Sequence, residues 1–373
     1  MPSNTILLLY VSVGQGHRRA ALAIESALKE ADPFLRIVCL DLMELWPRWV
    51  GRLIVGLYRG LVRAAPRLWA YLYDHRRIKE RFARPLDIIH LFCRRRVCGL
   101  MKELSPAAVV CTQAIPCTLV ADCKAHSPTG YSLIAVPTDF LVHTYWINDN
   151  IDLYLLPSRE SGLLVIERGV DAGRVRVTGI PVHPEFARRL DPEVLKRKYG
   201  LVSSLPTVLM MGGGEGSVSM ARLISALDVR KELFQMAALS GRNLKQHAQL
   251  MRLRDRLVHP LTVFSFTDSV DELMAAVDLI VTKPGGLTTA EALVKKLPMV
   301  LIDPLPGQED FNARFLQEHG AANSAADDVD AAEAVSDLLV NGDLRSRMVA
   351  AGEKIRRPDA ARLAARYIID SIN

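Results

Sequence analysis

Short apolar runs alternate with amphipathic stretches along most of the chain, a pattern typical of an α/β protein. Runs of strand length occupy Thr5–Ser12, Arg36–Leu42, Ala107–Thr112, Leu133–Thr138 and Arg176–Gly179 in the first half. The second half has such runs at Thr207–Met211, Leu261–Phe266, Asp278–Thr282 and Met299–Ile302, and helical periodicity over Asp327–Val340, Leu344–Ile355 and Ala360–Ile372. We therefore expect strands and helices to alternate through both halves.

Two of these strands run directly into glycine turns followed by helices. The first turn is Val13–His17, before a helix over Arg18–Glu30, and the second is Gly212–Ser217. One such unit opening each half predicts an α/β fold of two Rossmann-like, doubly wound domains that face each other across a cleft. The proline-rich joint Gly179–Pro184 separates an N-terminal domain, residues 1–182, from a C-terminal domain, residues 183–357. The last helix, residues 358–373, is expected to pack back on the first domain.

A third glycine turn, Lys283–Gly286, joins the strand Asp278–Thr282 to a helix over Leu287–Lys296, which Thr288 or Thr289 can cap. A helix N-terminus with bare main-chain N–H groups at a sheet edge is a seat for phosphate. Such turns are usually only turns, and it is the series of residues that follows which indicates a ligand. Glu291 can accept from neighbouring ribose hydroxyls, and Gln308, Glu309 and Asn312 can grip a sugar. The series predicts a nucleotide-sugar site.

Composition excludes several other classes of protein. The chain has 373 residues, half of them hydrophobic, with few aromatics and no apolar run of about 20 residues that would span a bilayer. The N-terminus shows no signal peptide, because the first strand begins at once. The six cysteines, none in a C-x-x-C pair, are expected to be reduced and buried in a cytoplasmic protein.

The net charge of +6 is concentrated in one segment. Between Trp46 and Lys102 there are 14 Lys or Arg residues against three acids, a net charge of +11, so the rest of the chain carries −5. At helical spacing, Trp46, Trp49, Leu53 and Leu57 share an apolar face, and arginines including Arg52 form a stripe opposite. An ordinary surface helix would also fit, but this arrangement is typical of a helix lying on an anionic membrane. No nucleic-acid-binding motif is present, so nucleic acid is not an expected partner.

Candidate catalytic side chains follow the first-half strands. His17 lies at a helix N-terminus, where the helix dipole disfavours the imidazolium and leaves a neutral base; a His that only caps the helix is the alternative. Asp139 and His143 follow a strand at an edge where α/β sheets bind substrates. A dinucleotide fingerprint fails because Arg19 occupies the third glycine position, although Asp41 ends the second strand. A Walker loop is absent as well.

Six motifs in this order resemble one known family. They are the S-x-G-x-G-H of Ser12–His17, the T-D-F-x-x-H-x-x-W of Thr138–Trp146, the V-T-G-I-P-V of Val177–Val182, the G-G-G-E-G of Gly212–Gly216, the T-K-P-G-G-L-T-x-x-E-A-L of Thr282–Leu293 and the P-G-Q-E-x-x-N-A of Pro306–Ala313. The chain resembles the monogalactosyldiacylglycerol synthase and processive diacylglycerol glucosyltransferase family, with the lipid-linked muropeptide N-acetylglucosaminyltransferase as a more distant relative.

The resemblance implies a GT-B fold and an inverting transfer of a hexose from a UDP-sugar to a diacylglycerol-type lipid, without a cofactor or an active-site metal. His17 would be the base, with Asp139 as a rival for that role. The implied UDP-sugar contacts are Gly16, Gly213, Gly214, Phe266, Thr267, Gly285, Gly286, Leu287, Thr288, Glu291, Gln308, Glu309 and Asn312. The implied membrane and acceptor contacts are Trp46, Trp49, Arg52, Leu53, Leu57 and His143.

The implied location is cytoplasmic and peripheral on the inner face of the cell membrane. His183 stands where relatives commonly carry an arginine that can meet a phosphate. Two rival functions remain open from the sequence: a UDP-sugar 2-epimerase and a catalytically silent membrane-binding module. The sequence does not distinguish glucose, galactose and glucuronate as donors, and it leaves the lipid acceptor, the number of sugars added and the oligomeric state open.

Overall fold

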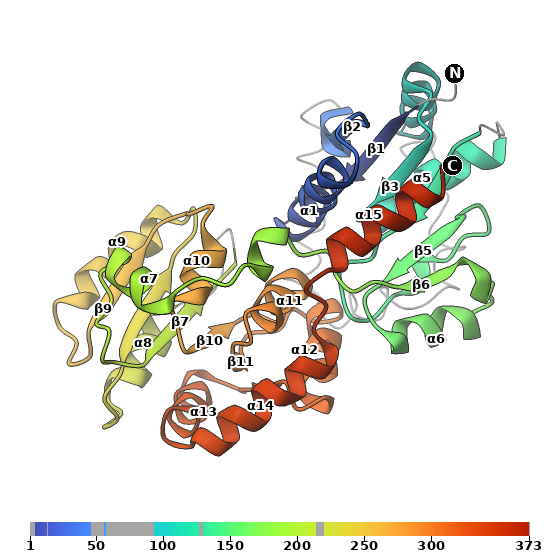
Figure 1. The fold of residues 1–373 in the computed structure, drawn as a ribbon. Helices are drawn as coiled ribbons and strands as arrows, with labels where there is room; N and C mark the ends of the chain where they lie inside the picture. The colour runs from blue at the N-terminus through green and yellow to red at the C-terminus, as the bar shows by residue number, and fades with distance from the viewer. Residues whose placement is uncertain are drawn as a thin grey trace. The chain divides into compact units, whose positions relative to one another are not determined.

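The computed structural model describes residues 4–12, 14–45, 56, 93–126, 130–213 and 220–372. The chain forms two compact units, which are coloured by residue number in Figure 1. Unit 1 comprises Met1–Pro184, Pro306–Gln308 and Asp359–Asn373, and unit 2 comprises Glu185–Leu305 and Glu309–Pro358. The described helices include none that is long and apolar enough to cross a membrane.

Unit 1 is built on a six-stranded parallel sheet with the strand order β2-β1-β3-β4-β5-β6. The strands are β1 (Thr5–Tyr10), β2 (Arg36–Asp41), β3 (Ala108–Cys111), β4 (Ser132–Ala135), β5 (Leu153–Leu156) and β6 (Val175–Val177). The helices are α1 (Gly16–Ala31), α5 (Ala114–His126), α6 (Arg159–Glu167) and α15 (Ala360–Asp370), with 3-10 turns η1 (Leu42–Leu45), η2 (Thr144–Trp146) and η3 (Ala172–Arg174). Residues 93–104 are also helical.

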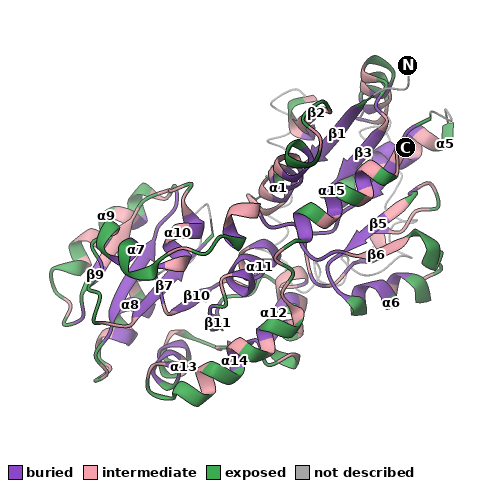
Figure 2. Ribbon diagram, viewed as in Figure 1, coloured by how far each residue is buried: buried purple, intermediate pink, exposed green. Residues whose placement is uncertain are grey.

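Both faces of this sheet are buried, as the central strands in Figure 2 show. Successive side chains of a strand point to opposite faces, so β1 contributes to two cores. Leu7 and Leu9 pack on the face covered by α5 and residues 93–104, whereas Ile6 and Leu8 pack on the face covered by α1 and α15. This two-sided burial explains why β1 is an uninterrupted apolar run in the sequence.

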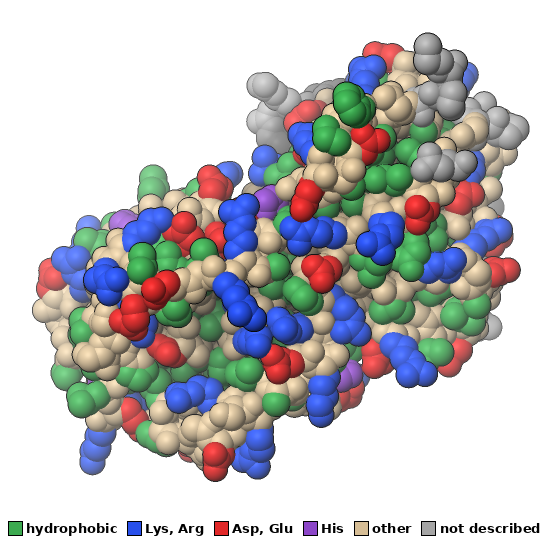
Figure 3. Space-filling model, viewed as in Figure 1, with side chains coloured by type: hydrophobic (Ala, Val, Ile, Leu, Met, Phe, Trp, Pro, Cys, Tyr) green, Lys and Arg blue, Asp and Glu red, His purple; other side chains and the backbone are tan. Residues whose placement is uncertain are grey.

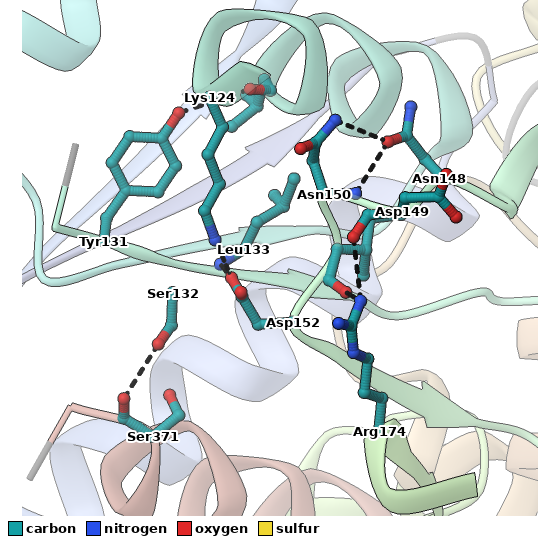
Figure 4. A network of polar contacts seen from close by, with 12 residues as sticks. Lys124, Tyr131, Ser132, Leu133, Asn148, Asp149, Asn150, Asp152, Arg174 and Ser371 are labelled. Carbon is teal, nitrogen blue, oxygen red and sulfur yellow. Dashed lines mark hydrogen bonds and ion pairs between the residues drawn. The ribbon is translucent and has the colours of Figure 1, made fainter. Parts of the chain in front are cut away.

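The C-terminal helix α15 belongs to unit 1 and lies beside α1 (Figure 1). Small side chains permit the close approach: Ala361, Ala364 and Ala365 are buried against the core that includes α1. Arg362 pairs with Glu30 of α1 at 3.1 Å. The end of the chain is tied to the sheet as well, because the Ser132 hydroxyl donates to the main-chain oxygen of Ser371 at 2.9 Å (Figure 4).

The amino edge of the unit 1 sheet is closed by a polar network, drawn in Figure 4. Asp152 pairs with Lys124 of α5 and accepts from the main-chain N–H of Leu133 at 2.6 Å. Arg174 donates to the main-chain oxygens of Asp149 and Ile151 at 2.8 and 3.3 Å. These contacts satisfy main-chain groups where β4 and β5 begin, so this edge is engaged in holding the fold.

The structure contains a disulfide between Cys98 and Cys123, which joins helical residues 93–104 to α5. The expectation that all six cysteines are reduced is therefore wrong for this pair. Sequence spacing gave no sign of it, because the two cysteines lie 25 positions apart and meet only through the packing of two helices. The other four, Cys39, Cys93, Cys111 and Cys117, are free thiols.

Unit 2 is built on a second six-stranded parallel sheet, with the order β12-β11-β10-β7-β8-β9. Its strands are β7 (Thr207–Met211), β8 (Gln235–Leu239), β9 (Leu261–Phe264), β10 (Leu279–Thr282), β11 (Met299–Leu301) and β12 (Ala322–Ser324). Its helices are α7 (Pro192–Lys198), α8 (Met220–Asp228), α9 (Leu244–Arg254), α10 (Val270–Ala275), α11 (Gly286–Val294), α12 (Gln308–Glu318), α13 (Asp328–Val340) and α14 (Gly342–Ile355), and the turn η4 (Pro184–Ala187) enters the unit. Read from the far edge, this is the strand order of the Rossmann fold.

Candidate active site

In each unit the strand order reverses direction beside a strand that leads into a glycine turn. The reversal lies between β1 and β3 in unit 1 and between β7 and β10 in unit 2. Open α/β sheets bind ligands beyond the carboxyl ends of strands at such points. The candidate residues that follow β1, β3, β7 and β10 therefore lie where each sheet, taken by itself, offers a site.

His17 occupies the first turn of α1, directly after the glycine turn of unit 1. Its Nδ1 lies 2.9 Å from the main-chain oxygen of Thr112 and 2.9 Å from the Thr138 hydroxyl. Thr112 follows β3 and Thr138 follows β4, and both are buried. The Thr112 hydroxyl donates in return to the main-chain oxygen of His17 at 2.9 Å. The ring is thus held from two strands at its Nδ1 side.

These contacts determine which ring nitrogen of the neutral imidazole is basic. A carbonyl oxygen can only accept, so the contact with Thr112 requires a proton on Nδ1. The Nδ1–H then also faces the Thr138 oxygen, and Nε2 keeps the lone pair of the neutral ring. Burial lowers the pKa of His17 from its ordinary value, while the Asp139 carboxylate raises it in part. At neutral pH the side chain is therefore a neutral imidazole with its base at Nε2.

Asp139 and Gln308 come together in unit 1. The amide Nε2 of Gln308 donates to Asp139 Oδ2 at 3.1 Å. Gln308 lies in the short segment Pro306–Gln308, and Gly307 adopts a positive φ of 98°, a conformation open to glycine. One candidate for the sugar and one candidate for catalysis, taken from motifs 169 positions apart, are thus neighbours in the fold.

His143 is buried inside unit 1, with 9% of its surface exposed. It caps η2 by accepting from the main-chain N–H of Tyr145 at 3.3 Å, and its ring lies against Tyr145 and Trp146. Burial, with the charges of His17 and Arg168, lowers the pKa of His143 to about 3. We had expected His143 to meet the acceptor or the membrane; its burial leaves little of the ring to do so, and its contacts are structural.

Asp41 supports the glycine turn of unit 1 from the end of β2. Its Oδ1 accepts from the main-chain N–H groups of Ser12 at 3.3 Å and Met43 at 3.0 Å. In a dinucleotide-binding fold, an acid at this place would bind ribose hydroxyls. Here the carboxylate is buried and engaged with the main chain, in accord with the missing third glycine of the fingerprint.

In unit 2, the turn after β10 leads directly into α11. Gly285 is the N-cap, and no described side chain caps the helix. The expected cap by Thr288 or Thr289 is wrong: the Thr289 hydroxyl donates backwards, to the main-chain oxygens of Gly285 and Gly286 at 2.9 and 3.1 Å. A hydroxyl one turn inside the helix reaches the preceding carbonyls more readily than the first N–H groups. The helix N-terminus therefore keeps its positive end for a ligand.

Glu291, Asn312 and Glu309 differ in their surroundings. Glu291 lies on α11 and is 2% exposed. Asn312 lies on α12 with 0% exposure, and its Nδ2 donates to the main-chain oxygen of Pro284 at 3.0 Å. The carboxylate of Glu309 accepts from the main-chain N–H of Leu305 at 2.7 Å. Asn312 and Glu309, both expected at sugar hydroxyls, thus have main-chain partners within unit 2.

The ends of β7, β8 and β9 supply further candidate contacts. Gly213 follows β7 with a positive φ of 79°, so glycine suits this position. Phe266 and Thr267 follow β9, and the guanidinium of Arg242, just after β8, stacks 4.6 Å above the Phe266 ring. Sequence reasoning missed Arg242, since nothing in the run from Ser240 to Asn243 indicates that its side chain reaches the next strand's end.

Several expected contacts lie outside the described residues. They are Trp46, Trp49, Arg52, Leu53, Leu57 and Gly214. On the face drawn in Figure 3, the basic and acidic side chains of the described residues are interspersed. Within the described ranges, no three His, Cys, Asp or Glu side chains are grouped so that they could hold a metal ion.

Two family descriptions together cover most of the chain. Residues 17–182 match the monogalactosyldiacylglycerol (MGDG) synthase family, and residues 207–356 match the glycosyltransferase family 28 C-terminal domain. The chain is an MGDG synthase domain joined to a family 28 glycosyltransferase domain. The family resemblance drawn from the six motifs is thereby confirmed.

A curated relative of this glycosyltransferase-family chain is a processive diacylglycerol beta-glucosyltransferase of Bacillus cytotoxicus. It is 28% identical over 374 aligned residues, which cover 98% of this chain and 92% of the relative. The MurG structure of Acinetobacter baumannii aligns with a TM-score of 0.65 at 15% identity, over 99% of this chain and 100% of MurG.

A UDP-GlcNAc 2-epimerase of Neisseria meningitidis, solved with UDP-GlcNAc, aligns with a TM-score of 0.61 at 11% identity, over 98% of this chain and 99% of the epimerase. At such identities these two structures speak for the fold alone. They confirm the GT-B class of two Rossmann-like units. Because a glycosyltransferase and an epimerase share it, the fold does not decide between those activities, whereas the family matches favour the glycosyltransferase.

Proposed function

We propose that this protein transfers a hexose from a UDP-sugar to a diacylglycerol-type membrane lipid, with inversion at the anomeric carbon. The observation that carries the proposal is the match along nearly the whole chain to relatives named as processive diacylglycerol beta-glucosyltransferases. Because these relatives are named for glucose, we propose UDP-glucose as the preferred donor over UDP-galactose and UDP-glucuronate.

The proposed reaction is a single displacement at the anomeric carbon. The acceptor hydroxyl attacks as the bond to UDP breaks, through a transition state with oxocarbenium character. His17 removes the acceptor proton at Nε2, since Nδ1 is occupied by the contact with Thr112. Thr138 holds the same ring from a second strand. Asp139, close enough to act on His17 electrostatically, favours the imidazolium that forms as the proton is taken.

The leaving diphosphate is proposed to bind at the start of α11 in unit 2. Negative charge grows on the diphosphate as the bond to the sugar breaks, and oriented main-chain N–H groups at an uncapped helix N-terminus can stabilise it. The N–H groups of Gly285, Gly286, Leu287 and Thr288 would share this task, with Gly213 at the end of β7. The proposal includes no metal ion and no cofactor in the active site.

The remaining donor contacts follow from the same unit. Glu291 would accept from the ribose hydroxyls, and the main chain at Phe266 and Thr267 would pair with uracil. Gln308 and Glu309 would contact the sugar, and Gly16 would lie beside it at the glycine turn of unit 1. For the acceptor, the basic stretch from Trp46 to Lys102 would dock on an anionic leaflet of the inner membrane face and admit the lipid.

The direct test uses the purified protein with diacylglycerol in vesicles that contain an anionic lipid. UDP-glucose, UDP-galactose and UDP-glucuronate are supplied in separate reactions, and the lipid products are resolved by thin-layer chromatography. We expect a glycosylated diacylglycerol and release of UDP, fastest with UDP-glucose. Conversion of a UDP-sugar to its 2-epimer without any lipid would overturn the proposal in favour of an epimerase. Vesicle binding with no release of UDP would instead favour a silent membrane-binding module.

A further inference from the structure

The turn between β10 and α11 is held by two buried side chains that act on three successive carbonyls. Asn312 Nδ2 donates to the main-chain oxygen of Pro284 at 3.0 Å. The Thr289 hydroxyl donates to the oxygens of Gly285 at 2.9 Å and of Gly286 at 3.1 Å. Asn312 and Thr289 are both 0% exposed. Thr289 belongs to the helix itself, whereas Asn312 reaches the turn from α12.

A carbonyl held on one side fixes an N–H on the other. The peptide unit is planar, and in a trans peptide the C=O of one residue and the N–H of the next point in opposite directions. The peptide between Pro284 and Gly285 is trans. Because Asn312 holds the Pro284 oxygen toward α12, the N–H of Gly285 points away from α12. Thr289 sets the N–H groups of Gly286 and Leu287 in the same manner.

This arrangement matters most at the Pro284 carbonyl. The other two carbonyls are within or next to α11, and Gly285 also accepts from the main-chain N–H of Thr289 at 3.0 Å. Helix geometry therefore directs them already. Pro284 precedes the helix, and glycine at the next position leaves the intervening peptide freer to rotate than any other residue would. The contact with Asn312 restrains this peptide.

We propose that Asn312 is a positioning residue for the diphosphate, which aims the Gly285 N–H at the phosphate, and that it is not a ligand of the sugar hydroxyls. This inference rests on the proposed function. It assigns the asparagine of the P-G-Q-E-x-x-N-A motif to the leaving group, through the main chain of the T-K-P-G-G turn. It also gives a physical reason for the two motifs to occur together: one supplies the N–H groups and the other orients the first of them.

The test compares ligands that differ in one part. UDP has the diphosphate and no sugar, and uridine has neither. Asn312→Ala and Asn312→Asp are measured by titration calorimetry with UDP and by ligand-observed NMR with uridine. The aspartate variant has the same size but cannot donate, so its carboxylate faces the Pro284 oxygen unfavourably. Gln317→Ala, at an exposed position of the same helix, is the matched control.

We expect both Asn312 variants to bind UDP about 10- to 100-fold more weakly, the range for losing one hydrogen bond to a charged group. Uridine affinity should stay the same, and Gln317→Ala should match the wild type for both ligands. UDP affinity unchanged in both variants would overturn the inference, since a sugar ligand can be lost without effect on UDP. An equal loss for UDP and uridine would overturn it too, because that pattern reports general damage to unit 2. Failure of the wild-type protein to bind UDP would instead remove the proposed function, and the inference with it.

Discussion

The main-chain oxygen of Thr112 lies 2.9 Å from Nδ1 of His17 and determines which nitrogen of the ring is basic. The two residues belong to neighbouring strands at the point where the unit 1 sheet reverses its order, since His17 follows β1 and Thr112 follows β3. A main-chain acceptor is well suited to this task because it carries no proton and has no alternative state. The topology of the sheet therefore prepares the side chain for general-base chemistry.

Replacing His17 separates its two contributions. The amide nitrogen of asparagine can take the place of Nδ1 and donate to Thr112, but asparagine has no base at the position of Nε2. We expect His17→Asn to keep the fold and UDP affinity and to lower turnover by about 10²- to 10⁴-fold. His17→Ala should lose as much turnover and some stability besides. Wild-type turnover in His17→Asn, measured by release of UDP in the presence of acceptor, would exclude His17 as the base.

The Thr138 hydroxyl offers a second way to examine how the ring is held. Thr138→Val has nearly the same volume but no partner for Nδ1–H, whereas Thr138→Ser keeps the hydroxyl. A neutral hydrogen bond contributes about 1 kcal/mol, so we expect Thr138→Val to lower kcat about fivefold without changing UDP affinity. Thr138→Ser should stay close to the wild type. Equal activity of the valine and serine variants would show that the hydroxyl does not position the base.

How far the sequence predicts the structure can be seen at particular elements. The strands whose apolar runs contain several β-branched residues, such as β1 and β10, lie where they were expected. The sequence gave no such signal for β8, Gln-Met-Ala-Ala-Leu, or for β12, Ala-Asn-Ser, because neither has a β-branched residue. Both are strands because their neighbours in the sheet supply hydrogen bonds and burial, which are tertiary effects.

The candidate site shows the same division between local and distant information. The glycine turns and the positions of His17 and Glu291 on helices follow from local pattern, and the structure has them so. The contact of Gln308 with Asp139, the contact of Asn312 with Pro284 and the stacking of Arg242 on Phe266 join separate parts of the chain. Such pairings depend on how helices and loops pack, and no single motif encodes them.

Glu291 allows the ribose contact to be tested atom by atom. Glu291→Gln keeps the size of this buried side chain and replaces one acceptor oxygen by a donor. We expect about 10- to 100-fold weaker UDP binding, because a hydrogen bond to a charged group is lost. The wild type should also bind 2′-deoxy-UDP more weakly than UDP, whereas the glutamine variant should hardly distinguish the two. A variant that still discriminates between them as well as the wild type does would place the ribose elsewhere.

The disulfide predicts a countable chemical outcome. Alkylation of the unfolded protein without reductant should modify four cysteines, and prior reduction should raise the number to six. The pair closes a loop across a separation of 25 residues, so Cys98→Ser with Cys123→Ser should lower the free energy of unfolding by about 3 kcal/mol. Mass spectrometry gives the count and urea denaturation gives the stability. Six modified cysteines before reduction would show that the pair is not bonded in the purified protein.

His143 predicts how the stability of unit 1 depends on pH. Its pKa is about 3 in the folded protein, because burial and the charges of His17 and Arg168 disfavour the imidazolium, against about 6.5 in the unfolded chain. As pH falls below about 6.5, the unfolded chain takes up a proton that the folded protein excludes, so the stabilising contribution is complete above that pH and is lost down to about pH 3.

The expected slope from this one group is about 1.4 kcal/mol per pH unit in that window. His143→Asn is the informative variant, because asparagine can still accept from the Tyr145 N–H as the cap of η2 but does not titrate. Its unfolding free energy, measured by urea denaturation from pH 7 to pH 4, should be lower at pH 7 and fall less steeply on acidification. Burial also lowers the pKa of His17, so part of the slope should remain in the variant. Parallel curves for the wild type and the variant would mean that His143 is not excluded from protonation in the folded protein.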